Sequence, residues 1–359
     1  MDSSSAPAGQ ACAVTALVHV HTTASDGRAT PAQIARLAAR AGVRVVVLTD
    51  HDCLSPGGGW QDGVLLVAGQ ELSPRHNHLL AAGLSRPLPR QRGDGVNGDP
   101  AKSLAQAAQR GAWTALAHPL DPAMPLLANS RAFVTLDFRH LETPGLELWN
   151  AMSAFKQDLD RPWKALARLF MPRTYLAGPH PLLLALWDTL GRRRPWAAFA
   201  GADAHAFGTG RRWLPVRIFS YRRHMRLLTT GLWLERQFSG QAGPDQEMVL
   251  QALGQGRCYL ALGRARGFEC RLQPAQGPEE LPGSERPHEP GLSLWARLPG
   301  WGQVSLLHNG RLVERRQGRE FSWPVTAPGV WRLVARRWRP PAGWRPWIYC
   351  NPFYLREAA

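Results

Sequence analysis

Acidic residues are scarce in this sequence of 359 residues. It contains 27 Asp and Glu but 43 Lys and Arg, which gives a formal net charge of +16. Cysteine is also rare: the five residues include no Cys-x-x-Cys pair, which argues against a disulfide framework and a zinc ribbon. The sequence has no apolar run of about 20 residues, so we expect no membrane span and no membrane partner. With no secretory signal pattern at its start, the chain is expected to be cytoplasmic with reduced thiols.

The basic residues are almost all Arg and are spread along the chain, with only Arg192-Arg193-Arg194 forming a triplet. Proteins that recognise nucleic acids usually gather basic residues on one face or within a known motif. The spread favours a positive field that attracts a small anionic substrate, and it predicts no specific nucleic-acid partner. The sequence does not define the oligomeric state.

Apolar runs rich in β-branched residues alternate with helical patterns along most of the chain. The first helix has clear boundaries: Thr30 and Gln33 form a capping box, Pro31 suits the first helical position, and Gly42 ends the helix. Strands are predicted at 14–20, 43–48, 64–68, 78–84, 112–117, 146–148 and 197–200, and helices at 30–41, 101–110 and, with interruptions, 151–191. This alternation predicts an α/β protein with a parallel sheet, and the number of strands suits a closed barrel.

The pattern changes after a segment rich in Pro, Gly and Glu. Short apolar runs separated by turns such as Asn309-Gly310 predict hairpins and a small antiparallel β-sandwich. Within it, strands are expected at 292–298, 304–308, 321–325 and 330–334. The predicted domains are a tail at 1–12, a barrel at 13–272 with a helical insertion at 151–195, a linker at 273–290 and a C-terminal β domain at 291–359.

Histidine and carboxylate residues gather at the predicted strand ends. In His19-Val20-His21 the alternation of a strand places both imidazoles on one face. The other groups are Asp26, Asp50-His51-Asp52, Glu71, His76-Asn77-His78, His118 and Asp203-Ala204-His205. Because the carboxyl ends of parallel strands meet at one mouth of a barrel, we expect these side chains to share a pocket. Imidazole and carboxylate ligands without thiolates favour a catalytic site for Zn²⁺, Mn²⁺ or Fe²⁺.

The order of these motifs resembles that of the polymerase and histidinol phosphatase (PHP) superfamily of metal-dependent hydrolases. The resemblance covers residues 14–210 and is carried by Val18-His19-Val20-His21, Ser25-Asp26-Gly27, Thr49-Asp50-His51, Gly69-Gln70-Glu71, His78, Ala117-His118-Pro119 and Gly201-Ala202-Asp203-Ala204-His205. Segments 145–150 and 347–352 are similar to those of the carbaryl-hydrolase-type branch, whose members carry a small C-terminal β domain. The resemblance implies a distorted (β/α)₇ TIM-like barrel.

The resemblance also implies a set of metal ligands. One ion would be held by His19, His21, Glu71 and Asp203, a second by Glu71, His78 and His118, and a third by Asp26, His51 and His205. His76 is the alternative to His78. Many relatives carry His at the position of Asp26, so two or three divalent ions are expected. The residues implied in catalysis are His19, His21, Glu71, His118, Asp203 and His205.

The leading hypothesis is a metal-dependent phosphoesterase that hydrolyses a small phosphorylated, nucleotide-like substrate through a metal-bridging hydroxide. A PHP-type hydrolase of a carbamate, ester or amide bond is the second hypothesis. A non-catalytic metal-binding module and a nuclease are the remaining alternatives.

Several polar residues near these motifs have two interpretations. Asp50 and Asp52 either orient ligating imidazoles or belong to loops, and Asn150 either touches substrate or bonds to the backbone. Arg211-Arg212 either clamps a phosphate or is solvated. The insertion at 151–195 could form a lid over the pocket.

Overall fold

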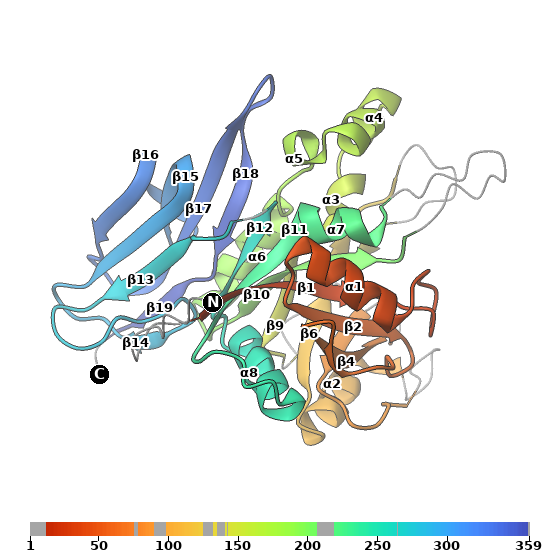
Figure 1. The fold of residues 1–359 in the computed structure, drawn as a ribbon. Coiled ribbons are helices and arrows are strands. Elements are labelled where there is room, and N and C mark those ends of the chain that lie inside the picture. Colours follow the sequence, from red (N-terminus) through yellow and green to blue (C-terminus); the bar gives the residue numbers. More distant parts are fainter. Residues whose placement is uncertain are drawn as a thin grey trace, which may run out of the picture.

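The computed structural model describes residues 12–74, 78–89, 98–124, 132–134, 141, 143–206, 219–263 and 265–357. Seven strands close into a barrel, in which each strand pairs with the next and the last returns to the first (Figure 1). In order around the ring they are β1 (Cys12–Val20), β2 (Val45–His51), β4 (Val64–Leu72), β5 (His78–Ala82), β6 (Trp113–Ala117), β9 (Gly145–Asn150) and β10 (Ala197–Ala204). The predicted α/β barrel is thereby confirmed.

The distortion of the barrel lies at β5. This strand runs antiparallel to both of its neighbours, β4 and β6, whereas the other five pairings around the ring are parallel. The first residue of β5, His78, therefore lies at the same mouth as the carboxyl ends of the other strands. An antiparallel strand in the ring thus brings a strand-initial residue to the mouth where a (β/α) barrel gathers its functional groups.

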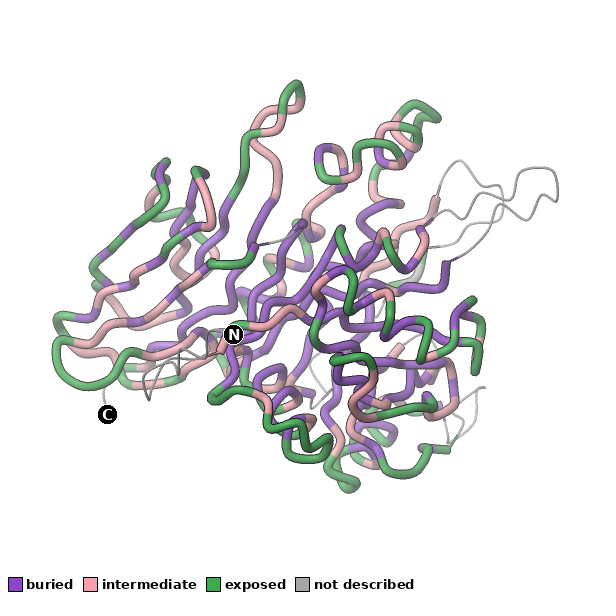
Figure 2. Tube along the Cα trace, in the orientation of Figure 1, coloured by how far each residue is buried: buried purple, intermediate pink, exposed green. Residues whose placement is uncertain are grey.

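Barrel strands are continuously apolar because both of their faces are covered. Residues 45–48 of β2 and 64–67 of β4 are fully buried, and Figure 2 shows buried backbone along the barrel strands, with exposed segments mainly on the surrounding helices and loops. The first covering helix, α1 (Pro31–Ala41), has the expected boundaries: the Thr30 side chain accepts from the Gln33 N–H, and Gly42 adopts a φ of 69° at the C-cap. Both ends of α1 are therefore set by local sequence.

The other helices are α2 (Pro100–Gln109), α3 (Ala151–Lys156), α4 (Pro162–Phe170), α5 (Pro172–Tyr175), α6 (Pro181–Gly191), α7 (Tyr221–Leu227) and α8 (Ala242–Gly254). Four of them, α3 to α6, make up the insertion predicted between β9 and β10. The structure contains two helices that the sequence analysis did not predict, α7 and α8. None of the helices in the described ranges is long and apolar enough to span a membrane.

Further strands lie outside the ring: β3 (Gly59–Gln61), β7 (Leu120–Asp121), β8 (Phe133–Val134), β11 (Leu228–Leu234), β12 (Cys258–Leu262), β13 (Glu269–Gln273), β14 (Glu285–Pro287), β15 (Ser293–His308), β16 (Arg311–Pro324), β17 (Gly329–Arg339), β18 (Gly343–Cys350) and β19 (Phe353–Arg356). Strand β11 pairs with the first half of β1, and β12 pairs with both β11 and β18. Hydrogen-bonded strands thus run without a break from the barrel into the C-terminal strands.

Two expectations for the C-terminal region were wrong in detail. The runs 292–298 and 304–308 form one long strand, β15, whose pairing with β16 shifts register between Arg297 and Gly302. The predicted linker at 273–290 contains β14, which pairs in parallel with β19. The hairpin at Asn309-Gly310 is present, with φ values of 51° and 79°. The division of the chain into domains remains a prediction.

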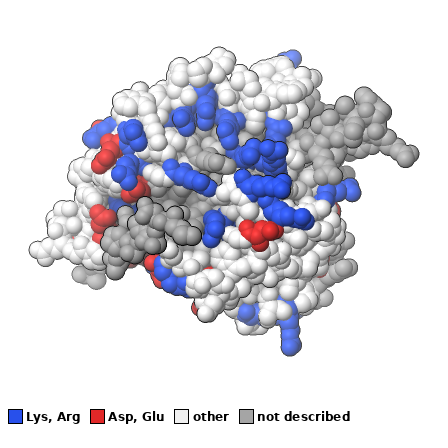
Figure 3. Space-filling model, viewed as in Figure 1, with Lys and Arg blue, Asp and Glu red and all other residues white. Residues whose placement is uncertain are grey.

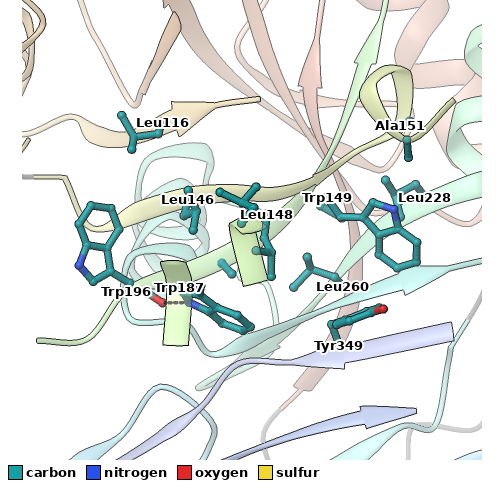
Figure 4. Packing of buried hydrophobic residues seen from close by; sticks show 14 of the residues in the cluster. Leu116, Leu146, Leu148, Trp149, Ala151, Trp187, Trp196, Leu228, Leu260 and Tyr349 are labelled. Atoms are coloured by element: carbon teal, nitrogen blue, oxygen red, sulfur yellow. Dashed lines mark hydrogen bonds between the residues drawn. The ribbon is translucent and has the colours of Figure 1, made fainter. Parts of the chain in front are cut away.

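Aromatic packing joins the insertion to the barrel and to the C-terminal strands (Figure 4). Trp149 on β9 lies edge-on to Tyr349 on β18, with ring centroids 5.2 Å apart. Trp187 on α6 donates its indole N–H to the carbonyl of Trp196 at 2.8 Å. A buried pair adds a polar link, since the Arg332 Nε lies 2.6 Å from the Asp188 Oδ1. The insertion is therefore fixed along one side by buried contacts.

Candidate metal centre

All nine predicted ligands lie together at one mouth of the barrel. They lie in the last residues of β1, β2, β4, β6 and β10 or just after them, except His78, which starts the antiparallel strand β5. Their ligand atoms fall into overlapping groups whose members lie within 4.8 Å of one another. The groups are His19, His21 and Asp203; Glu71, His78 and His118; His21, Asp26, His51 and His205; and His19, His118 and Glu147.

The carboxylate of Glu71 stands at the centre of the cluster and is fully buried. Its Oε2 lies 3.2 Å from the His19 Nε2 and 3.3 Å from the His21 Nε2. Its Oε1 lies 2.8 Å from the His78 Nδ1 and 3.2 Å from the His118 Nε2. One oxygen thus faces the first group of imidazoles and the other faces the second, which is the arrangement expected of a bridging carboxylate.

A break in the regular strand positions the paired histidines. His19 has a φ of 66°, and the pairing of β1 shifts register on either side of it, between Val18 and Val20 with β10 and between Leu17 and Val20 with β2. Simple alternation along β1 therefore does not explain why His19 and His21 lie together. A bulge of this kind re-aims a side chain. The two rings lie with centroids 5.1 Å apart.

Left-handed backbone recurs at two other strand ends of the site. His118 has a φ of 23° and Asp203 a φ of 50°, values that non-glycine residues rarely adopt. Residues held in such conformations cluster at functional sites, where the surrounding structure imposes them. The strands thus bend at the points where their side chains enter the cluster.

The loop after β1 carries Asp26 into the third group. The Asp26 Oδ1 lies 3.2 Å from the His205 Nε2, and its Oδ2 lies 4.0 Å from the His51 Nε2. Gly27 is required beside it, because a Cβ there would lie 2.5 Å from the His21 carbonyl oxygen. The loop can therefore fold tightly enough to return its carboxylate to the histidines.

The roles of the neighbouring carboxylates also become clear. Buried Asp50 accepts hydrogen bonds from the Thr22 backbone N–H at 2.7 Å and from the Ser25 hydroxyl at 2.6 Å. It thereby holds the loop between His21 and Asp26 in place. Asp52 is a turn residue with a φ of 51°, and its N–H donates to the carbonyl of Glu71.

One member of the cluster was missed as a site residue. Glu147 on β9 is buried, and its Oε1 lies 3.1 Å from the His19 Nδ1 while its Oε2 accepts from the His118 backbone N–H at 2.5 Å. Asn150 combines two roles: its Oδ1 caps α3, and its Nδ2 donates to Glu147 at 2.9 Å. A carboxylate within an otherwise apolar barrel strand was the available signal for Glu147.

The mutual proximity of acids and imidazoles shifts their pKa values. Burial raises the pKa of a carboxyl, but His19 and His78 hold the pKa of Glu71 well below its usual range, and His19 and His21 do the same for Asp203. Burial alone would lower the pKa of His118, yet Glu71 and Asp203 raise it to about 9. Burial lowers the pKa of His21 to about 4. Glu71 and Asp203 are therefore ionised at neutral pH, and the imidazole of His21 is neutral, so it can offer a nitrogen lone pair to a cation.

The donor set fits divalent cations. His21 is fully buried, and neither of its ring nitrogens forms a hydrogen bond of good geometry with another described residue, although carboxylate oxygens of Glu71 and Asp203 lie 3.3 and 3.6 Å from its Nε2. Buried polar atoms of this kind need an explanation, and a bound ion is a recognised one. Imidazole nitrogens, which bind a cation once they are deprotonated, form together with the ionised carboxylate oxygens a ligand set suited to Zn²⁺, Mn²⁺ or Fe²⁺. The assignment of each residue to a particular ion remains a prediction.

The helical insertion reaches the edge of the cluster. A narrow hollow beside His118 and Glu147 is lined on its other side by His180 and Leu183 of the insertion. This placement agrees with the idea that residues 151–195 shape the substrate pocket. His76, the alternative to His78, and Arg211-Arg212 lie outside the described residues.

Comparison with known proteins gives structural likenesses only. No family model and no curated protein matches the chain. One similar solved structure is a two-domain protein from Bacteroides vulgatus containing a predicted PHP-like metal-dependent phosphoesterase, with 12% identity, coverage of 95% of each chain and a TM-score of 0.47. A second is a protein from Bifidobacterium adolescentis provisionally assigned as a metal-dependent phosphoesterase, with 16% identity over 57% of this chain and 92% of that one and a TM-score of 0.34. A third is an amidohydrolase from Chromobacterium violaceum with bound sulfate and no metal, with 15% identity over 53% of this chain and 87% of that one and a TM-score of 0.32. At these identities and TM-scores, the functional proposal rests on the site's own residues.

Proposed function

We propose that this chain is a metal-dependent hydrolase and, more specifically, a phosphoesterase acting on a small phosphorylated substrate. The observation that carries the proposal is the position of Glu71, whose two oxygens face two different groups of histidines. Two adjacent cation positions are the arrangement used for in-line displacement at phosphorus. When bound, the cations would supply an activated water and would neutralise charge on the phosphoryl oxygens.

The chain's own residues prepare the site for this chemistry. Glu147 accepts from the His19 Nδ1, which keeps a proton on that nitrogen and turns Nε2 towards Glu71. Asp50 fixes the loop that carries Asp26, and Asn150 anchors Glu147. The ligand atoms are therefore oriented before any ion or substrate arrives, which reduces the reorganisation needed during the reaction.

A second candidate is hydrolysis of a carbamate or carboxylic ester. The hollow beside His118 is lined largely by apolar side chains, among them Leu120, Trp149 and Leu183. Such a wall suits an apolar leaving group better than a charged one. This candidate uses the same cluster and the same cations, so the two differ in substrate and not in ligand set.

The decisive test is an activity screen of protein loaded with Mn²⁺ or Zn²⁺. A nitrophenyl phosphate and a naphthyl carbamate are assayed side by side, with His19→Ala as the inactive variant and His288→Ala as a matched control outside the cluster. Phosphate turnover that is lost with chelator and in His19→Ala, but kept in His288→Ala, supports the phosphoesterase. Turnover of the carbamate alone supports the second candidate, and no metal-dependent turnover of either substrate contradicts both.

A further inference from the structure

Helix α4 turns an apolar stripe outward. Trp163, Leu166 and Phe170 are 60%, 54% and 81% exposed, and their spacing places them on one face of the helix. On the opposite face Arg168 is buried and donates to the backbone carbonyls of Phe155 and Gln157. A surface helix normally shows the reverse pattern. Because Arg168 anchors the polar side within the protein, the outward direction of the stripe is built into the fold.

Arginines surround the base of this stripe. One hollow is lined by Phe170, Met171, Arg173, Arg222, Arg223 and Arg226, and an adjoining one by Arg173, Arg226, Arg337 and Arg339. Of the salt bridges that the described residues form, none includes any of these six arginines. Burial and repulsion from Arg337 and Arg173 lower the pKa of Arg339. Arg339 is therefore repelled by two neighbouring guanidinium groups, and no salt bridge among the described residues neutralises the cluster.

Helix α4 and the β17–β18 hairpin project on the same side of the molecule (Figure 1), and Lys and Arg side chains gather over the upper part of this face (Figure 3). We propose that the α4 face, formed by Trp163, Leu166, Phe170 and Met171 with the six arginines named above, docks peripherally on an anionic membrane. The stripe would enter the boundary between headgroups and acyl chains, and the arginines would contact lipid phosphates. The expectation of no membrane partner rested on the lack of a spanning segment, which concerns crossing a bilayer and does not oppose contact with its surface.

Charge and side-chain chemistry select this partner over two others. A second copy of the chain would bring one unpaired arginine cluster against another, which is repulsive. A nucleic acid would satisfy the arginines and could stack on Trp163 and Phe170, but it would leave Leu166 and Met171 on the same face without an apolar partner. An anionic bilayer provides both phosphates and an apolar layer.

The α4 face lies close to the metal centre. The Tyr221 hydroxyl of α7 donates to the carbonyl of His21 at 2.8 Å, and Arg222 and Arg226 of the same helix line the arginine hollows. One short helix therefore connects the two. Docking would hold the mouth of the barrel near the membrane surface whatever bond the site hydrolyses.

Sedimentation of the full-length protein with vesicles tests the proposal. The probes are vesicles of phosphatidylcholine alone and vesicles in which one third of the lipid is phosphatidylserine. We expect binding only to the latter. The triple variant Trp163→Gln, Leu166→Gln, Phe170→Gln should abolish most of it, and Arg173→Gln or Arg226→Gln should each weaken it about fivefold. Matched controls at exposed residues of β16, Leu312→Gln with Val313→Gln and separately Arg319→Gln, should leave it unchanged.

All replaced side chains are exposed, so unfolding temperatures close to that of the natural chain will verify the fold of each variant. The proposal is overturned if the natural chain does not sediment with phosphatidylserine vesicles. It is also overturned if the triple variant binds as well as the natural chain, because attraction would then depend on net charge alone. Retention of single-stranded RNA without vesicle binding would replace the membrane with a nucleic acid.

Discussion

Replacing Glu147 by Gln tests how the metal centre is held in place. Glu147 accepts from three donors, the His19 Nδ1, the His118 backbone N–H and the Asn150 Nδ2, at 3.1, 2.5 and 2.9 Å. A glutamine has nearly the same shape, but it carries no charge and only one of its two terminal atoms accepts. At least one buried donor therefore loses its acceptor.

The expected size of the effect follows from these contacts. A hydrogen bond to a charged group contributes about 1.5–3 kcal/mol, and a buried donor left without a partner costs about 1–3 kcal/mol. The loss falls mainly on the orientation of His19, because its Nε2 faces the site only while Nδ1 is held. We expect the affinity for Mn²⁺ to fall about 10–100-fold, as for other partners of ligating histidines.

Calorimetric titration with Mn²⁺ measures this change. The matched control is Asp245→Asn on α8, which removes another buried carboxylate that accepts from the N–H groups of Ser239 and Gly240. That variant should be less stable but should bind Mn²⁺ with unchanged affinity. An affinity in Glu147→Gln equal to that of the natural chain would refute the proposed role of Glu147, and an equal loss in Asp245→Asn would show that the assay reports stability alone.

Three further predictions concern packing and charge. Gly201→Ala should impair Mn²⁺ binding in the same titration, because its Cβ would lie 1.5 Å from the Glu147 Oε1. Asp188→Asn should lower the free energy of unfolding by about 3–5 kcal/mol in urea titrations, since it leaves Arg332 buried without its charged partner. Burial lowers the pKa of His224 from its ordinary value to about 4, so the unfolded chain binds this proton first as pH falls below about 6.5. Stability should therefore drop by about 2 kcal/mol between about pH 7 and about pH 5, and His224→Leu should remove that part of the slope; an unchanged slope would refute the assignment.

Local signals in the sequence were sufficient for the barrel. The capping box at Thr30, the helix end at Gly42 and the continuously apolar runs each have a short-range physical cause, and each is present in the structure. The same holds for the hairpin at Asn309-Gly310. The joining of two apolar runs into β15 was not predictable in this way, because its continuity depends on pairing with β16 and β17 rather than on its own residues.

The candidate site, too, was predictable only where its residues follow from local sequence. The polar residues at strand ends could be collected from the sequence, since strand ends meet at one mouth of a barrel. Glu147 was missed because the sequence shows only a carboxylate within an apolar strand, whereas its contacts with His19 and His118 depend on the tertiary structure. The outward-facing stripe of α4 was not predicted, for a related reason. Helical spacing shows that Trp163, Leu166 and Phe170 share a face, but it does not show whether that face points to the solvent or to the core.

The backbone of the site supports a functional origin for the cluster. His19, His118 and Asp203 adopt positive φ, where each residue costs about 1–3 kcal/mol relative to an unstrained conformation. Glycine would relieve this cost at all three positions, yet each carries a side chain that reaches Glu71 or its neighbours. A cluster that served only stability would favour glycine or apolar residues there. The presence of two imidazoles and a carboxylate at strained positions is therefore best explained by what those side chains bind.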